Sequence, residues 1–177
     1  QPDYGVMGSS WSFGHWIQYF ADRPVLNNGF HRNRKGNTEA IRVLLARHEK
    51  DALGVLERNR VRYLILSDIS FSLPSYARIL GEEPARVVRI EREKGSRRYY
   101  RPGLEYQSIV GNRLYLFDGL ISAPGQPPEF SQRLRLVHES PERLQAMGYP
   151  ASVVKIFEFV PGAILSGQTR PGSPVEL

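Results

Sequence analysis

Residues 61–66, Val-Arg-Tyr-Leu-Ile-Leu, form the most strand-like stretch of this 177-residue chain. Four consecutive apolar or aromatic residues, from Tyr63 to Leu66, are typical of a strand that is buried on both faces. The segments 37–48 and 51–59 come just before it and have apolar residues at helical spacing. Two helices followed by a buried strand favour an α/β layer with this strand at its centre.

The rest of the chain extends this layer in both directions. Residues 1–14 are rich in glycine, serine and aromatics and predict a loop, followed by a helix at 15–22 with Trp16, Tyr19 and Phe20 on one face. Beyond the central strand we expect a helix at 74–80, a strand at 86–92, a polar loop at 94–101 and a helix at 105–117. Residues 133–138, 152–160 and 163–167 predict strands.

These elements predict a mixed α/β fold, with N-terminal helices packed on a central strand and a C-terminal antiparallel β portion. The segment 123–128 holds three prolines and a glycine and therefore predicts a loop. We accordingly expect an α/β core domain at 1–122 and a β portion at 123–177, packed on the core as one unit.

The composition and the absence of several known motifs limit the functional classes to which the chain can belong. Hydrophobic residues make up 41% of the chain and it has no cysteine, so we expect a packed core without disulfides or thiolate metal sites. The four histidines form no HxxxH or HxH pair, and no Walker, GxGxxG or GxSxG motif is present. We therefore predict no metal site and no catalytic residue in this chain, and no apolar run of membrane-spanning length is found.

The formal net charge of +6 leaves several kinds of partner open. Residues 97–101 mix arginines with tyrosines, as single-strand nucleic-acid binders do, but no recognised nucleic-acid motif accompanies them. We therefore expect no nucleic-acid partner. Trp11, Phe13 and Trp16 surround Gly14 and could form a binding platform or anchor the loop to the core.

Residues 10–17, Ser-Trp-Ser-Phe-Gly-His-Trp-Ile, resemble the region of the WWDYG motif in catalytic subunits of oligosaccharyltransferases. The blocks 21–28, 61–66, 113–119, 134–140 and 154–163 are similar to later parts of the same family and keep its order, with the tail most similar to archaeal-type members. The chain therefore resembles the soluble C-terminal domain of such a subunit.

The resemblance implies a membrane enzyme that transfers an oligosaccharide from a lipid-linked donor to the asparagine of an Asn-x-Ser/Thr sequence. The catalytic metal, Mn²⁺ or Mg²⁺, and its acidic ligands then belong to the membrane portion. The domain itself would carry no cofactor, would be inactive alone, and would face the extracytoplasmic or periplasmic side. Its partners would be the acceptor polypeptide and, through the membrane portion, the lipid-linked oligosaccharide.

The family motif grips the hydroxyl of the acceptor Ser/Thr, and its positions fall here on Ser10, Trp11, Ser12, Phe13 and Gly14. Only Trp11 and Gly14 match, because serines replace the first Trp and the Asp, and phenylalanine replaces the Tyr. A second wall of the family's pocket comes from the helix after the central strand, where Tyr76 and Ile79 are the candidates, with plain core contacts as the alternative. A non-catalytic peptide- or glycan-binding module of a membrane protein is the alternative function.

Overall fold

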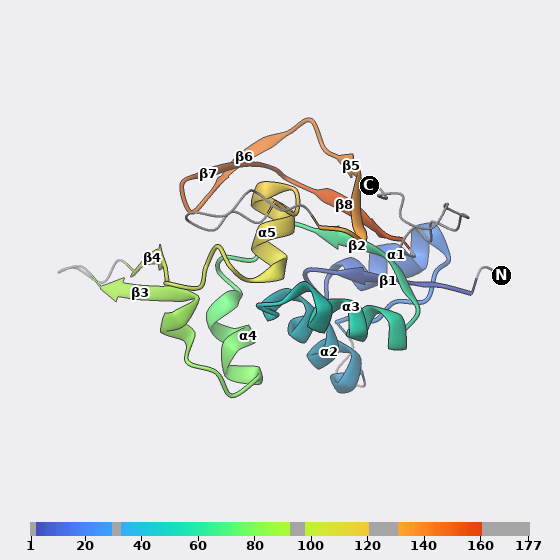
Figure 1. The fold of residues 1–177 in the computed structure, drawn as a ribbon, viewed down its shortest axis with the longest axis horizontal. Coiled ribbons are helices and arrows are strands. Elements are labelled where there is room, and N and C mark those ends of the chain that lie inside the picture. Colours follow the sequence, from blue (N-terminus) through green and yellow to red (C-terminus); the bar gives the residue numbers. More distant parts are fainter. Residues whose placement is uncertain (1–2, 30–32, 93–97, 121–130, 161–177) are drawn as a thin grey trace, which may run out of the picture.

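The computed structural model describes residues 3–29, 33–92, 98–120 and 131–160. Its main sheet has the strand order β1-β2-β8-β5 (Figure 1). Strand β1 (Gly5–Gly8) runs parallel to β2 (Val61–Leu66), whereas β8 (Lys155–Phe159) is antiparallel to both β2 and β5 (Leu134–Glu139). The predicted central strand is confirmed, because β2 lies in the interior of the sheet between β1 and β8.

Strand β1 lies within the segment 1–14, for which the sequence predicted only a loop. That prediction was wrong for Gly5–Gly8, which pairs with β2 over its whole length. Four residues that begin and end with glycine carry little strand propensity of their own. The strand forms because a long-range partner, β2, offers a free edge, and this kind of contact leaves no local pattern in the sequence.

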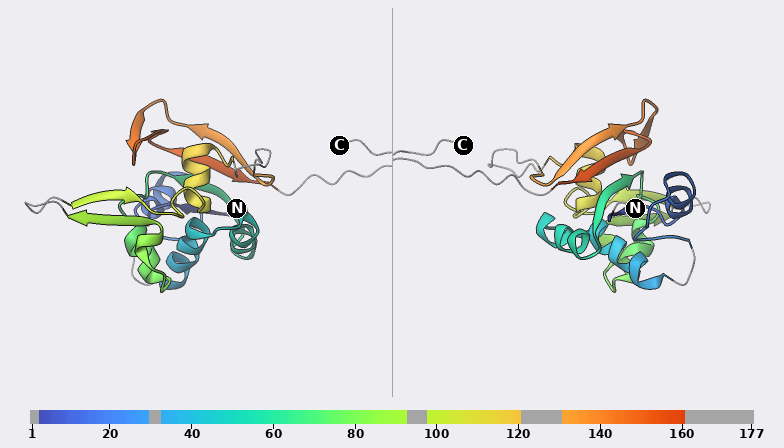
Figure 2. Two further views of the ribbon diagram at one scale, coloured as in Figure 1. Left: turned by 60° about the vertical axis from the view of Figure 1, so that its left-hand side comes forward. Right: turned by 90° about the vertical axis from the view of Figure 1, so that its right-hand side faces the viewer.

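Three helices lie below the sheet in Figure 1: α2 (Arg34–Leu45), α3 (Glu49–Arg58) and α4 (Leu73–Ile79). Helix α2 begins three residues earlier than predicted, because the side chain of Asn33 accepts a hydrogen bond from the backbone N–H of Gly36 and caps it. Helix α1 (Phe13–Ala21) lies at the opposite edge of the molecule from α3, as Figure 2 (right) shows.

Two hairpins extend from this layer. Strand β3 (Val88–Arg92) pairs with β4 (Arg98–Pro102), so the loop predicted at 94–101 is wrong in its last part. Strands β6 (Arg143–Ala146) and β7 (Tyr149–Ser152) form a hairpin that was not predicted. A short 3₁₀ turn (Pro84–Arg86) precedes β3, and α5 (Val110–Phe117) begins later than predicted. The predicted strand at 163–167 lies outside the described residues.

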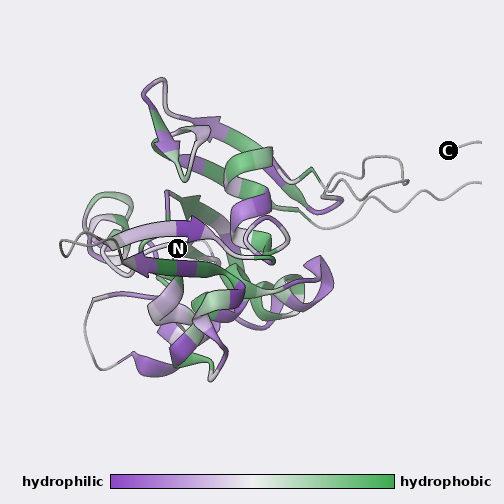
Figure 3. Cartoon of the chain, turned by 90° about the vertical axis from the view of Figure 1, so that its left-hand side faces the viewer, coloured by the Kyte–Doolittle hydropathy of each residue, from purple (hydrophilic) through white to green (hydrophobic). Residues whose placement is uncertain are grey.

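One hydrophobic core joins helices α2 to α5, β2 and the C-terminal strands, and its largest fully buried side chains include Tyr106, Tyr115 and Phe157. Hydrophilic and hydrophobic segments alternate along helices and strands (Figure 3), as expected for elements with one face on the core. The predicted mixed α/β class is confirmed. The predicted division near residue 122 falls in a segment outside the described residues and stays a prediction.

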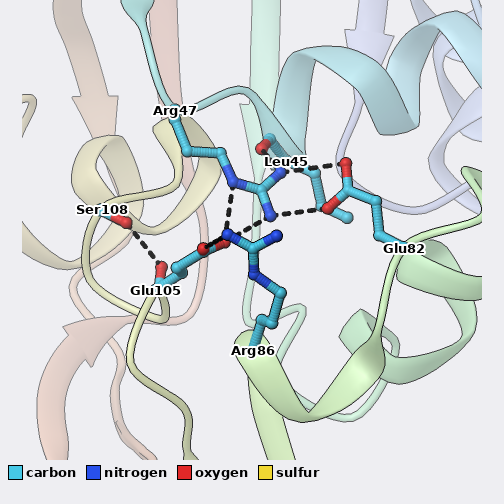
Figure 4. A network of polar contacts seen from close by, with 6 residues as sticks. All are labelled: Leu45, Arg47, Glu82, Arg86, Glu105 and Ser108. Carbon is cyan, nitrogen blue, oxygen red and sulfur yellow. Dashed lines mark hydrogen bonds and ion pairs between the residues drawn. The ribbon is translucent and has the colours of Figure 1, made fainter.

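A network of charged side chains connects the turn between α2 and α3 to the segments that precede the 3₁₀ turn η1 (Pro84–Arg86) and α5 (Figure 4). The Arg47 guanidinium donates to both Glu82 oxygens at 3.1 and 2.6 Å and to Glu105 at 2.9 and 2.5 Å. Arg86 also contacts Glu105. Burial opposes ionisation of Glu105, but hydrogen bonds from Arg47 and Arg86 outweigh it, so the pKa of Glu105 is lowered.

This shift predicts an acid-labile contribution to stability. A carboxylate with a lowered folded-state pKa stabilises the fold above its unfolded pKa and loses that effect as pH falls through the folded pKa. We expect Glu105→Gln to lower the melting temperature near neutral pH and to weaken its dependence on pH between about 7 and 3. Glu142→Gln, at an exposed position, is the control. If the melting temperatures of the wild type and Glu105→Gln fell by the same amount as the pH was lowered, the prediction would be contradicted.

Candidate functional site

Residues 9–12 and the first two residues of α1 form the segment that we call the 9–14 loop, which leaves the sheet where the carboxyl ends of β1 and β2 lie side by side. Ser9 is buried, and its backbone N–H donates to the carbonyl of Ile65 at 2.8 Å. Its hydroxyl oxygen accepts from the backbone N–H of Ser67 at 2.9 Å and lies 3.1 Å from the Ser67 hydroxyl. The loops that follow the two parallel strands are therefore tied together at this edge, where sites in α/β sheets commonly gather.

The exposed part of the 9–14 loop presents one indole and two hydroxyls. Trp11 is 47% exposed. The hydroxyl oxygens of Ser10 and Ser12 lie 3.0 Å apart, and the Ser12 N–H donates to Ser10 at 3.4 Å. Because each hydroxyl can both donate and accept, this pair can serve either role toward a ligand. The predicted residues Ser10, Trp11 and Ser12 are therefore brought together at the surface.

The side chain of Asn27 binds the backbone of Gly8, the residue just before the 9–14 loop. Its buried side-chain amide donates to the carbonyl of Gly8 at 2.8 Å and accepts from the N–H of Gly8 at 3.0 Å. These two bonds satisfy the last peptide group of β1 in place of a strand partner. The next residue, Asn28, has its own N–H and carbonyl bonded to the side chain of Asn37 in α2, both at 3.1 Å. The loop therefore rests on an anchored turn.

Gly14 lies against the same turn. A Cβ atom added at Gly14 would lie 2.4 Å from the carbonyl oxygen of Asn27 and 2.7 Å from Cβ of Asn28. No side chain fits at these distances, so glycine is needed here for close approach and not for an unusual φ angle. Phe13 is half-buried and packs against Gly8, where an added Cβ would lie 2.7 Å from Cβ of Phe13. Phe13 and Gly14 therefore position the loop.

The two residues predicted on α4 occupy different environments. Tyr76 is 4% exposed, and its hydroxyl donates to the carbonyl of Ser9 at 3.0 Å. Burial raises the pKa of Tyr76, against a smaller opposite effect of a hydrogen bond with Ser72, so the hydroxyl keeps its proton. Tyr76 thus braces the 9–14 loop from α4, while Ile79 is 49% exposed at the end of that helix.

Sequence reasoning gave no structural role to Ser9, Ser67 or Asn27. Asn27 carried only a turn signal, and its contact with Gly8 spans 19 residues of sequence. A buried polar side chain with a distant backbone partner has no local pattern from which it could be found. The one available signal was position, because Ser67 follows the central strand directly.

The described part of the chain contains no group of three or more His, Cys, Asp or Glu side chains that could hold a metal ion. Among the described helices, none has the length and apolar character needed to cross a bilayer. The 9–14 loop presents an exposed flat ring and two neighbouring hydroxyls on a hydrogen-bonded base.

The same fold occurs in solved structures of other proteins. About 90% of the chain superimposes on 82% of the C-terminal globular domain of an oligosaccharyltransferase from Archaeoglobus fulgidus, with a TM-score of 0.57 and 22% identity. It also superimposes on 28% of a larger oligosaccharyltransferase of that organism tethered to an acceptor peptide containing an NVT sequon, with a TM-score of 0.61 and 19% identity over 89% of this chain. The chain therefore has the fold of the C-terminal globular domain of archaeal oligosaccharyltransferases.

Sequence comparison shows which proteins this chain is similar to. Residues 1–70 match the family described as the AglB core domain. Dolichyl-phosphooligosaccharide-protein glycotransferase 2 of A. fulgidus is 35% identical over 65 residues, which are 37% of this chain and 10% of that protein. The aligned residues thus span about a tenth of the length of this relative. The resemblance to the C-terminal domain of an oligosaccharyltransferase catalytic subunit is confirmed, whereas the assignment of residues 10–14 to the WWDYG motif stays a prediction.

Two further structures of A. fulgidus oligosaccharyltransferases carry ligands. One is a complex with an inhibitory peptide and a dolichol-phosphate, with a TM-score of 0.59 and 18% identity over 89% of this chain and 27% of that chain. The other is a complex with zinc and sulfate, with a TM-score of 0.61 and 18% identity over 89% of this chain and 30% of that chain. At these identities the structures establish a shared fold, and their ligands are properties of those proteins.

Proposed function

We propose that this chain is the acceptor-recognition domain of an oligosaccharyltransferase-like membrane glycosyltransferase. One observation carries the proposal: an exposed indole and a pair of hydroxyls lie on a braced loop at the carboxyl ends of two parallel strands. The similar A. fulgidus structure tethered to an acceptor peptide supports the assignment. The acceptor polypeptide would bind across the 9–14 loop, with Trp11 beneath it.

The hydroxyl pair suits a polar side chain of the acceptor. Ser10 and Ser12 can together accept a hydrogen bond from a Ser or Thr hydroxyl and donate one back, and the Trp11 indole N–H is a further donor. A neutral serine binds more weakly than the carboxylate of the family motif, because charge-assisted hydrogen bonds are roughly twice as strong. We therefore expect weaker selectivity for Ser or Thr at the second residue after the acceptor asparagine.

The chemistry of transfer would lie outside this domain. The described residues offer no arrangement of ligands that fits a divalent metal, so no catalytic step is assigned to them. The full-length enzyme would supply the metal, Mn²⁺ or Mg²⁺, and the site for the lipid-linked oligosaccharide. The domain would then face the extracytoplasmic or periplasmic side of the membrane that anchors the enzyme. Its own contribution is to hold the acceptor so that the asparagine amide reaches that site.

We expect Trp11→Ala in the full-length protein to lower kcat/KM for an acceptor peptide by about tenfold, because losing one contact in a binding site typically costs ~1–3 kcal/mol. The loss should appear mainly as a higher KM for the acceptor, with the KM for the lipid-linked donor unchanged. Initial rates over a range of each substrate would measure both values.

Tyr99→Ala is the matched control, because Tyr99 is 43% exposed on β4 and Trp11 is 47% exposed. Acceptor kinetics that respond equally to both variants, or to neither, would contradict the proposal. Acceptor binding that depends on Trp11 in a full-length protein without transfer activity would instead indicate the non-catalytic peptide-binding module.

A further inference from the structure

Helix α1, whose first two residues belong to the 9–14 loop, turns its aromatic residues outward. Gly14 and Ile17 face the interior, while Trp16 is 61% exposed, Tyr19 81% and Phe20 72%. The Trp16 and Phe20 rings are stacked with centroids 5.6 Å apart, and Tyr19 meets Phe20 edge-to-face at 5.0 Å. These three residues form a continuous patch, which we call the aromatic face of α1.

The outer side of the helix carries no formal charge, although His15 and Gln18 are polar and exposed. No Asp, Glu, Lys or Arg occurs between Phe13 and Ala21, whereas a surface helix normally places charges on its outer face. Figure 2 (right) shows α1 at the edge of the molecule, on the other side from α3, and the exposed fractions of the three rings show that the aromatic face is open to solvent. Contiguous exposed apolar patches of this kind usually mark a binding surface.

A second copy of the chain is a poor match for the aromatic face. Aromatic side chains bury roughly 150–250 Å² each, so three that are partly exposed offer roughly 400 Å² per copy, about half of the ~800 Å² per partner in a standard interface. A planar lipid surface has no such requirement, since each inserted ring contributes independently. Trp and Tyr also have the amphipathic rings that settle at the headgroup level of bilayers.

Positive charge begins two residues after α1. The Arg23 guanidinium lies 5.4 Å from the Tyr4 ring and donates to its hydroxyl at 3.3 Å, and Arg62 lies 5.4 Å from the same ring. Arg62 and Arg135 share the single carboxylate Glu158, at 2.9 and 2.6 Å. Asp22 is exposed next to Arg23, so these three arginines face two acids and leave a small excess of positive charge, which attracts anionic headgroups.

We propose that the aromatic face of α1 docks on the headgroup region of a lipid bilayer, with the basic cluster of Arg23, Arg62 and Arg135 favouring anionic lipid. This contact would hold the 9–14 loop close to the membrane surface, since the loop runs directly into α1. The proposal goes beyond acceptor recognition and does not require it, because bilayer binding is a property of the isolated chain.

The test uses this chain and vesicles of phosphatidylcholine with or without phosphatidylglycerol. Trp11 and Trp16 are the two tryptophans of the chain, so vesicle binding should shift its emission to shorter wavelength without any substitution. Co-sedimentation should show stronger binding to the anionic vesicles. Wild-type protein that neither sediments with anionic vesicles nor changes its emission would overturn the proposal.

Variants then locate the contact. Trp16→Ser/Tyr19→Ser/Phe20→Ser should weaken vesicle binding by at least about tenfold, since three apolar rings can no longer enter the bilayer. The matched control is Ile90→Ser/Tyr99→Ser/Leu104→Ser, three exposed positions on and beside the β3–β4 hairpin. Tyr19→Ser alone, at the most exposed of the three rings, should give a smaller loss in the same direction. Equal losses in the two triple variants, or dimers of the wild type that the α1 variant abolishes, would overturn the proposal.

Discussion

Replacing Gly14 with alanine is expected to lower the melting temperature of the domain, although Gly→Ala inside a helix usually raises stability. The new Cβ would lie 2.4 Å from the carbonyl oxygen of Asn27 and 2.7 Å from Cβ of Asn28, both in the anchored turn. Overpacking of this kind typically costs ~1–3 kcal/mol and exceeds the ~0.5–1 kcal/mol that alanine gains in a helix. Thermal and urea unfolding of the purified chain would measure the change.

Gly54 provides the matched control for this substitution. It lies within α3, and a Cβ added there would meet only the flexible Arg58 side chain, at 3.4 Å. Gly54→Ala should therefore stabilise the domain by about 0.5–1 kcal/mol. The structure therefore predicts that the two variants change the free energy of unfolding in opposite directions. A change in the same direction would mean that the turn at Asn27 can move without cost.

The elements that sequence reasoning predicted best are those with a strong local pattern. The strand at Val61–Leu66 has the predicted bounds, because its apolar run needs no partner to be recognised. The helices α3 and α4 lie within one or two residues of their predicted positions for the same reason. Strand β1 and the β6–β7 hairpin were missed because their pairing, not their composition, makes them strands.

The aromatic spacing in α1 was predicted correctly, but the spacing alone does not say which way the face turns. Trp16, Tyr19 and Phe20 share one side of the helix, and the structure places that side in solvent because Gly14 must lie against the turn at Asn27. A glycine thus decides the orientation of three aromatic rings. Hydrophobic periodicity identifies a face, and only tertiary contacts identify what it meets.

The candidate site was predictable in its exposed residues and not in its support. Trp11 and its neighbouring serines were identified by their place in a motif-like stretch. The atoms that hold them in place come from the residue after β2, from α4 and from the turn after α1, at separations of up to 67 residues. Tyr76 illustrates this. The sequence predicted that it contacts the acceptor, but in the structure its hydroxyl donates a hydrogen bond to the Ser9 carbonyl.

Asn27→Leu is expected to be among the most damaging single substitutions near the site. The leucine has a similar size but leaves the buried N–H and carbonyl of Gly8 without a partner. Each unsatisfied buried group costs ~1–3 kcal/mol, so we expect a loss of about 2–5 kcal/mol in the free energy of unfolding. Asn27→Asp should also lose stability at neutral pH, because its second carboxylate oxygen cannot donate to the Gly8 carbonyl and its charge is buried. Urea unfolding would rank the two variants.

Asn37 makes the comparison decisive, because it forms the same pair of hydrogen bonds with the backbone of Asn28 at 3.1 Å each. Asn37 is half-buried, whereas Asn27 is 4% exposed, so water can replace the lost bonds only at Asn37. Asn37→Leu should therefore cost at most about 1 kcal/mol, part of which the better helix propensity of leucine offsets. If the two variants lose equal stability, burial is not what gives the Asn27 clamp its strength, and the rigid base assigned to the 9–14 loop would have to be abandoned.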